Sequence, residues 1–218
     1  MAKSRRDKQV SLTKVKKNGK ELKKNLLAEV RRCVDAYQNL FVFSVDNMRT
    51  TKFIKIRQRF KTNSRFIFGK NSVLALALGR TVGSEHAKGL SKVSALLKGT
   101  RGLMFTDEDV DTVIKFFSSY EERDYSRGGE IASRTVELSE GPVPQFPFSM
   151  EPQLRKLGMP TKLNKGTVTL TKNFSVCQEG VKLSVDQARI LKFMGEELSS
   201  FKVNLLASWN KESGFRKL

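Results

Sequence analysis

Short apolar runs alternate with amphipathic stretches through the first 120 residues, and this alternation is the feature that most limits the fold. The runs "NLFVFSVDN" (39–47), "RFIFG" (65–69) and "GLMFT" (102–106) are rich in Phe and Val or lie beside turn-forming residues, so each predicts a buried strand. Between them, apolar residues recur every three or four positions, which is the spacing of a helix that buries one face. We therefore expect an α/β fold, with helices packed on a central sheet.

The same periodicity places the helices. One of them is predicted to follow Thr106 as its N-cap, with Asp107, Glu108 and Asp109 in its first turn, where carboxylates favour the helix dipole. We interpret this acidic trio as a helix start rather than a metal site, which would need ligands converging from elsewhere. The other helices are predicted at residues 20–37, 49–61, 71–79, 87–98 and from Ser184 to 194.

The pattern changes between about residues 125 and 182. This stretch holds all five prolines and the alternating segment "KGTVTLTKNFSV", which favours β structure with tight turns. A β-rich piece between two α/β stretches predicts a small inserted domain. The expected organisation is a basic N-terminal extension at 1–20, an α/β domain formed by 21–124 with 183–218, and the insertion at 125–182.

The positive charge is concentrated in the first half of the chain. The formal net charge is +19, and residues 1–100 carry 24 basic against 6 acidic side chains. A domain that only needed solubility would not segregate its charge, so this asymmetry predicts a polyanionic partner, with nucleic acid first. An acidic membrane surface is the alternative. Against it, the sequence has no apolar stretch near 18 residues and no signal-peptide core, so we expect no membrane partner.

The stretch "FIFGKNSVLALALGR" at 66–80 places a Gly-Lys pair between an apolar run and a predicted helix. The phosphate loop of NTPases needs a glycine five positions before this pair and a Ser or Thr after it, and here these places hold Ser64 and Asn71. The sequence therefore argues against a nucleotide loop. Lys70 and the first N–H groups of the following helix can still bind another phosphate, because a helix N-terminus favours an anion.

Cysteine and histidine are too scarce to suggest catalysis. Cys33, Cys177 and His86 lie far apart, so no zinc site, no catalytic triad and no disulfide framework is indicated, and a reducing intracellular compartment is the simpler interpretation. We expect no catalytic residue, no metal and no cofactor.

Five blocks in order resemble one family. They are "VDNMRTTKFIKIRQRF", "FIFGKNSVLALAL", "LLKGTRGLMFTDEDV", "MPTKLNKGTVTL" and the spacing at 181–195. Together they are similar to the ribosomal stalk-base proteins of archaea and eukaryotes, the large-subunit L-ten and acidic P-zero family. The match runs from about Leu22 to Trp209. The basic opening and "FTDEDVDTV…YEERDYSR" look most like the nuclear assembly factors within that family.

The resemblance implies a fold and a set of partners. The family has an α/β domain with a small insertion, and binds large-subunit rRNA at the stalk base beside a neighbouring stalk-base ribosomal protein. A member of the assembly-factor branch is expected to be non-enzymatic and to occupy this place on the pre-ribosomal particle until exchange, with release by a phosphatase-like factor. It would reside in the nucleolus and nucleus and shuttle to the cytoplasm. The sequence ends at Leu218 without stalk-dimer helices or an acidic tail, so no recruitment of translation GTPases is expected.

Two strand-to-helix turns are expected to form one phosphate-binding edge, because such turns emerge together in a parallel α/β layer. The first follows the strand at 39–47 and the second holds the Gly-Lys pair. The basic N-terminal segment is expected to fold along the RNA beside them. The candidate RNA-binding residues are Lys3, Arg5, Arg6, Lys8, Lys14, Lys16, Lys17, Lys20, Asn47, Arg49, Thr50, Lys52, Lys55, Gly69, Lys70, Asn71 and Ser72.

Three alternatives stay open from the sequence. The chain could be a structural ribosomal protein of the mature subunit, a metal-dependent enzyme acting on RNA, or a general DNA-binding protein. Most of the phenylalanines are expected in the core, because they lie in predicted strands and on inward helix faces rather than on a base-stacking platform.

Overall fold

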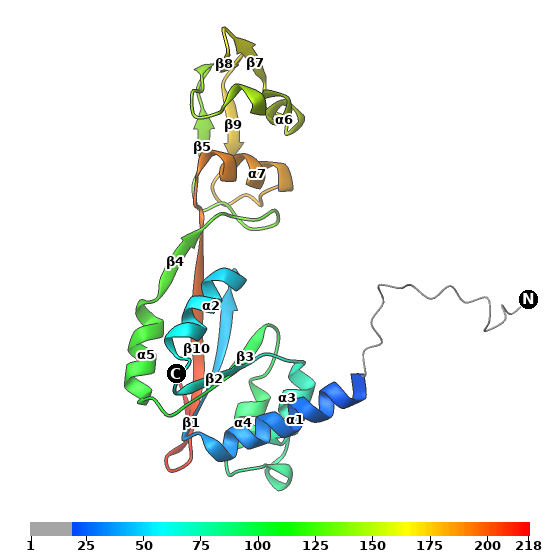
Figure 1. Ribbon diagram of the computed structural model, residues 1–218, viewed down its shortest axis with the longest axis vertical. Coiled ribbons are helices and arrows are strands. Elements are labelled where there is room, and N and C mark those ends of the chain that lie inside the picture. Colours follow the sequence, from blue (N-terminus) through cyan, green and yellow to red (C-terminus); the bar gives the residue numbers. More distant parts are fainter. Residues whose placement is uncertain (1–18) are drawn as a thin grey trace, which may run out of the picture. The chain divides into compact units, whose positions relative to one another are not determined.

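The computed structural model describes residues 19–218, so the candidate residues at positions 3–17 lie outside the described part. The described chain divides into two compact units. The first comprises residues 19–43, 62–110 and 206–218, and the second comprises 44–61 and 111–205. Figure 1 labels the helices and strands of both units.

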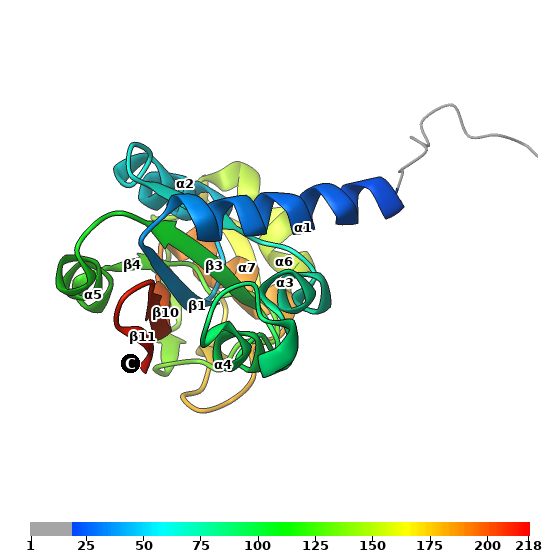
Figure 2. The same ribbon diagram turned by 90° about the horizontal axis from the view of Figure 1, so that it is seen from below.

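The first unit packs helices against sheet strands. Helix α1 packs along α3, and α3 packs along α4, as Figure 2 shows. Its elements are α1 (Gly19–Ala36), the start of β1 (Asn39–Asp46), β2 (Ser64–Ile67), α3 (Asn71–Leu78), the 3-10 helix η2 (Val82–Ser84), α4 (Leu90–Ala95), β3 (Arg101–Thr106), the end of β10 (Ser199–Asn210) and β11 (Gly214–Lys217).

The sheet has the strand order β11-β10-β1-β3-β2, with β4 (Glu121–Asp124) also paired to β10. Strand β2 runs antiparallel to β3, with Ser64 opposite Thr106 and Ile67 opposite Leu103. Strand β3 therefore lies between β1 and β2. This order corrects the expectation of neighbouring parallel strands at this end of the chain.

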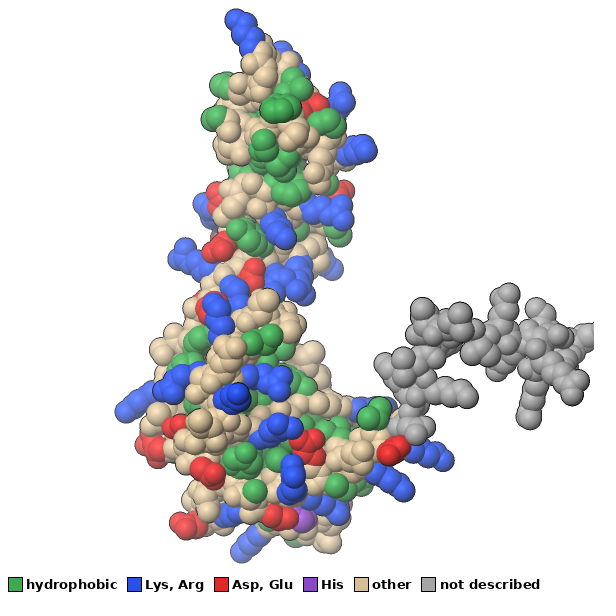
Figure 3. Space-filling view, viewed as in Figure 1, with side chains coloured by type: hydrophobic (Ala, Val, Ile, Leu, Met, Phe, Trp, Pro, Cys, Tyr) green, Lys and Arg blue, Asp and Glu red, His purple; other side chains and the backbone are tan. Residues whose placement is uncertain are grey.

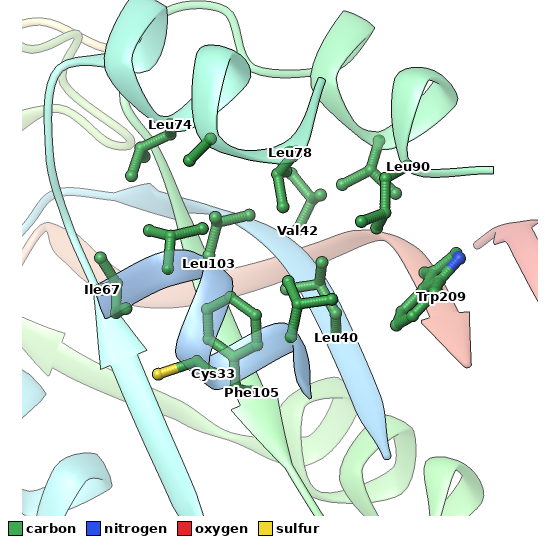
Figure 4. Close-up of a cluster of buried hydrophobic side chains, with 14 of the residues drawn as sticks. Cys33, Leu40, Val42, Ile67, Leu74, Leu78, Leu90, Leu103, Phe105 and Trp209 are labelled. Carbon is green, nitrogen blue, oxygen red and sulfur yellow. The ribbon is translucent and has the colours of Figure 1, made fainter. Parts of the chain in front are cut away.

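One face of the strands in the first unit is covered by α1, α3 and α4. The side chains that meet there come from every one of these elements, as Figure 4 shows for Cys33, Leu74 and Leu90. Trp209 of β10 closes one side, and its indole Nε1 donates a hydrogen bond to the Lys88 carbonyl at 3.0 Å. Removing one such buried Leu side chain would cost about 2–5 kcal/mol, so this core fixes where the α3 turn lies.

The second unit contains two helices near β4 and a separate strand-rich region. Its elements, beside the remaining parts of β1 and β10, are α2 (Thr50–Arg59), α5 (Val110–Ser119), β4, β5 (Val136–Leu138), β6 (Gly141–Pro142), the 3-10 helix η3 (Phe148–Met150), α6 (Glu151–Lys156), β7 (Thr161–Asn164), β8 (Thr167–Leu170), β9 (Phe174–Cys177) and α7 (Val185–Met194).

Aromatic side chains join α2 to α5. The ring of Phe60 lies 5.0 Å from that of Phe116, edge to face, and 5.7 Å from that of Phe117, stacked. Phe53 and Ile56 are buried one turn apart on the same helix, as the sequence predicted. The inward stripe of α2 is therefore apolar, and its basic residues must lie on the flanks and the outer side.

The strand-rich region has its own core. Strands β6, β8 and β7 form one small antiparallel sheet, and β5 pairs with β9. Val168 and Val176 pack with Leu191 of α7 in one cluster, so this core continues past residue 182. The β7–β8 hairpin turns at Lys165 and Gly166, both in the left-handed region with φ of 48° and 82°.

The α/β class with a strand-rich insertion is confirmed, and three local expectations change. Helix α5 begins at Val110 rather than near 107, because Thr106 is buried at the end of β3 and its hydroxyl accepts the Glu108 N–H within a turn. The helix expected at 87–98 is reduced to α4, since Gly89 in the left-handed conformation precedes it. The Ser184 cap of α7 is confirmed, with Gln187 completing a capping box.

Candidate nucleic-acid interface

The Gly-Lys turn of the first unit presents a helix N-terminus beside an exposed lysine. Lys70 is the N-cap of α3 in an extended conformation, and its carbonyl accepts the N–H groups of Val73 and Leu74 at 2.8 and 3.1 Å. The amides of Asn71 and Ser72 come earlier in the helix, where a backbone N–H has no intrahelical acceptor. With the exposed Lys70 ammonium beside them, these two N–H groups can hold one phosphate.

Neighbouring contacts hold this turn in place. The Asn71 side-chain amide donates to the Gly99 carbonyl at 2.6 Å, which ties α3 to the turn before β3. Gly69 lies so close to α1 that a Cβ there would be 2.6 Å from Leu26 Cδ2. The absence of a side chain at Gly69 therefore lets α1 pack against the turn.

Two further cations lie near the turn that the sequence did not single out. The Arg80 guanidinium donates to the Ser72 carbonyl at 3.3 Å, which brings it back to the first turn of α3. Lys98 is exposed and immediately precedes Gly99, the residue bonded to Asn71. Both are distant from Lys70 in the sequence, by 10 and 28 positions, so no local pattern could have indicated them.

Helix α1 begins with exposed charge. Lys20, Lys23 and Lys24 are all exposed in its first turns, and Lys20 is the one candidate of the N-terminal extension within the described residues. Lys3, Arg5, Arg6, Lys8, Lys14, Lys16 and Lys17 lie outside that part of the chain.

The other predicted turn belongs to the second unit. Asn47 adopts a left-handed conformation with φ of 50°, and its side-chain amide donates to Ser199 Oγ at 2.7 Å and to the Ser200 carbonyl at 3.0 Å. These bonds give Asn47 a structural role in joining the end of β1 to β10. Thr50 is exposed at the start of α2.

Strand β4 engages the three candidate cations of α2. Arg49 Nε lies 3.0 Å from Asp124 Oδ2, and the guanidinium also donates to the Tyr125 carbonyl. Lys52 Nζ lies 3.4 Å from the same carboxylate oxygen and donates to the Arg123 carbonyl. Arg49 and Lys52 keep only 14% and 16% of their side chains exposed, so their charges are largely used within the protein.

Lys55 is different, because 64% of its side chain is exposed although Nζ lies 3.0 Å from Glu122. A single exposed ion pair of this kind is weak and can be exchanged for another anion. Beyond it, Arg57, Arg59 and Lys61 are exposed, and the Arg59 guanidinium lies 5.8 Å over the Phe60 ring. The accessible charge of α2 is therefore Lys55 and the three cations after it, rather than Arg49 and Lys52.

The carboxylates of β4 are held in their charged form. The Tyr120 hydroxyl, 2.7 Å from Glu122, is the main reason that the pKa of Glu122 is lowered, and Lys55 and Lys52 add to it. Burial alone would raise the pKa of Asp124, but the Tyr125 backbone N–H and the charges of Arg49 and Lys52 outweigh burial and lower that pKa. Burial, the hydrogen bond and the charge of Glu122 raise the pKa of Tyr120 to about 12.

The two turns fall into different compact units. The argument that placed them at one edge assumed adjacent parallel strands, and β2 is antiparallel to β3 and separated from β1 by it. That argument is wrong, and each turn is a separate candidate site. Figure 3 shows basic side chains with acidic ones interspersed among them over the face drawn.

Metal and membrane sites were sought within residues 19–218. No group of three or more His, Cys, Asp or Glu side chains in that range is arranged to hold a metal ion. Each helix in the same range is too short or too polar to cross a membrane.

Two family models match consecutive parts of the chain. Residues 18–122 match the model described as ribosomal protein L10, and residues 126–196 match a model of the insertion domain in the corresponding 60S ribosomal protein. The Lys70 turn and α2 both lie in the L10 match.

Curated relatives cover almost the whole chain. It is 37% identical to the ribosome assembly factor mrt4 of Dictyostelium discoideum, over 97% of this chain and 95% of that protein. It is 40% identical to the factor of the same name from Schizosaccharomyces pombe, over 97% of this chain and 92% of that protein. Similarity to the large ribosomal subunit protein uL10 of Thermococcus gammatolerans is more distant, at 21% identity over 88% of this chain and 56% of that protein. The chain belongs to the mrt4 family of ribosome assembly factors, which is distantly related to ribosomal protein uL10.

Proposed function

We propose that this protein is an assembly factor of the large ribosomal subunit that binds rRNA at the stalk base of precursor particles and holds the place of the stalk-base ribosomal protein until exchange. Its near full-length similarity to ribosome assembly factors supports the role in assembly. Its match to ribosomal protein L10 supports the choice of RNA site. One structural observation carries the RNA contact, namely the exposed Lys70 beside the first amides of α3 in the L10-type segment.

The chemistry of the contact is backbone recognition. A phosphate at the α3 N-terminus would accept the N–H groups of Asn71 and Ser72 and pair with Lys70, and Arg80 and Lys98 would neutralise adjoining phosphates. Lys55 of α2 would exchange Glu122 for phosphate, while Arg49 and Lys52 would act by holding β4. Lys20 and the basic residues before α1 would follow the RNA backbone. Such contacts fix position and affinity without reading base identity.

The domain organisation is part of the proposal. The extension 1–20 and the α/β domain 21–124 with 183–218 would contact rRNA, and the insertion would begin near 125. The core that α7 shares with β8 and β9 favours an insertion that ends nearer to residue 196 than to 182.

The partners and location follow from the same role. The protein would lie beside the neighbouring stalk-base ribosomal protein on the pre-ribosomal particle, and a phosphatase-like factor would release it. It would act in the nucleolus and nucleus, shuttle to the cytoplasm on precursor particles, and catalyse no reaction itself. A retained structural protein of the mature subunit is the second candidate, favoured only by the distant similarity to uL10. Sedimentation separates the two roles, because a retained protein would be present in translating ribosomes.

Binding to the isolated stalk-base rRNA fragment tests the RNA contact. The full chain should prefer this fragment to transfer RNA near physiological salt, with a log-log salt slope of roughly 0.7–0.9 per phosphate neutralised. Lys70→Ala should weaken binding and reduce the slope by about one. Lys92→Ala removes an equal charge from α4 and should change neither value. Equal effects of the two variants would mean that the basic surface acts only through its total charge.

A further inference from the structure

We propose that a second site in the first unit, formed by the C-terminal end of α1 together with the ends of β2 and β3, binds one unstacked RNA nucleotide with its base held by Asp107. This inference rests on the proposed RNA-binding function and adds recognition of a base to the backbone contacts of the Lys70 turn. The site is a hollow of about 530 Å³ whose wall includes Arg32, Tyr37, Thr62, Arg65 and Asp107.

The size and the lining suit a nucleotide. Pockets for small ligands are commonly about 300–1,000 Å³, with a few placed polar groups on a partly apolar wall. Ala36 and Cys33 supply the apolar part of this wall. Burial raises the pKa of the Cys33 thiol, so it stays neutral and adds no negative charge.

Two arginines offer donors for a phosphate or a ribose. Arg65 is oriented by Glu29, whose carboxylate oxygen lies 2.6 Å from Nη2, and 53% of the Arg65 side chain remains exposed. Arg32 is exposed on the last turns of α1, and no ion pair or hydrogen bond involves its side chain within residues 19–218. A planar guanidinium can pair with phosphate or stack on a base, so Arg32 is the group available to the ligand.

Tyr37 supplies an aromatic surface at the same opening. It is partly buried, and its ring centroid lies 6.4 Å from that of Phe105 with the planes tilted by 39°. The contact with Phe105 anchors the ring without burying all of it. Bases of single-stranded RNA bind proteins by stacking on aromatic side chains in this way.

Asp107 is a fixed acceptor. Its Oδ1 accepts the Gln38 N–H at 2.9 Å, and its own N–H donates to the Asn63 carbonyl at 3.1 Å. Within the described residues, Oδ2 has no hydrogen-bond partner. A carboxylate held in this way accepts from N–H groups on the edge of a base, and guanine offers two adjacent donors whereas uracil offers one. The pocket should therefore prefer guanine.

The first experiment uses guanosine monophosphate and uridine monophosphate as probes of the full chain, followed by NMR. Guanosine monophosphate should shift the amide signals of Tyr37 and Asp107 and leave Lys70 unchanged, and uridine monophosphate should bind more weakly. Equal shifts with both probes, or no shift near Tyr37, would overturn the inference.

The second experiment uses the stalk-base rRNA fragment. Arg32→Ala and Asp107→Asn should each weaken binding roughly tenfold, as expected for a lost charge-assisted hydrogen bond. The Asn side chain can still accept the Gln38 N–H, so Asp107→Asn keeps the fold. Lys92→Ala is the charge-matched control. Normal affinity of both pocket variants would overturn the inference while leaving the proposed function standing. Failure of the unmodified chain to prefer the fragment would instead refute the proposed function, and the mononucleotide result would then decide on the pocket.

Discussion

Replacing Asp124 by Asn tests whether β4 neutralises α2 as the structure indicates. The substitution removes one negative charge and leaves Arg49 Nε and Lys52 Nζ without the carboxylate that lies 3.0 and 3.4 Å from them. Only 17% of the Asp124 side chain is exposed, so water can replace little of the lost interaction. The Asn side chain fills nearly the same volume, and packing should stay unchanged.

The expected cost lies between two limits. Loss of an exposed ion pair costs about 0–1 kcal/mol, and removing one partner of a fully buried pair costs about 3–5 kcal/mol. Asp124 serves two cations that are mostly but not wholly buried, so we expect the free energy of unfolding to fall by about 1–3 kcal/mol. For a chain of this size, each kcal/mol corresponds to a fall in Tm of about 2–4 °C.

The pH dependence has a definite sign. The pKa of Asp124 is lower in the folded protein than its ordinary value, so the carboxylate stabilises the fold above the ordinary pKa, and this stabilisation is lost as the pH falls through the folded pKa. Asn does not titrate. The difference in stability between the unmodified protein and Asp124→Asn should be constant near neutral pH and shrink in acid, below about pH 4.

Urea unfolding at pH 7 and at decreasing pH measures both effects. Glu121→Gln is the matched control, because Glu121 lies on the same strand but is exposed and forms no ion pair within residues 19–218. It should change the unfolding free energy by no more than about 0.5 kcal/mol. The reasoning would be refuted if Asp124→Asn behaved like Glu121→Gln, or if its destabilisation persisted unchanged in acid.

Three other substitutions probe the packing and electrostatics described above. Gly69→Ala places a methyl group 2.6 Å from Leu26 Cδ2, and since this is the end of a flexible side chain we expect a loss of only about 1 kcal/mol in a thermal melt, with Gly69→Val costing more. Tyr120→Phe should remove the tyrosine that ionises at about pH 12 from a spectrophotometric titration, and an unchanged titration curve would contradict that assignment. Phe60→Ala removes the ring that contacts Phe116 and Phe117 and should cost about 3–5 kcal/mol, whereas a loss below about 1 kcal/mol would mean that α2 and α5 do not depend on this contact.

Helices and strands could be predicted from the sequence wherever a buried stripe repeats. Helix α1, with Val30, Cys33 and Val34 buried on one face, and helix α2, with Phe53 and Ile56, both lie within two residues of their predicted ends. Local chemistry also sufficed for the Ser184 cap of α7. These features depend on neighbours within about one helical turn, which a single sequence displays.

Features that depend on distant residues could not be predicted. Arg49 and Asp124 are 75 positions apart, and nothing near "NMRTTK" indicates that "EERD" will neutralise it. The antiparallel pairing of β2 with β3 is a choice of topology that periodicity does not record. Thr106 has the composition of an N-cap but is buried at a strand end, so tertiary burial decided its role. Lys70 was found because its turn is local, whereas Arg80 and Lys98 reach the same turn only through the fold.

The central claim is that this protein holds the place of the stalk-base ribosomal protein on rRNA, and a competition experiment tests it most directly. The full chain would be bound to the stalk-base rRNA fragment at physiological salt, and the stalk-base ribosomal protein would be added in increasing amounts. We predict displacement with one-to-one stoichiometry, so that no complex contains both proteins. A stable complex of the fragment with both proteins bound at once would contradict the account.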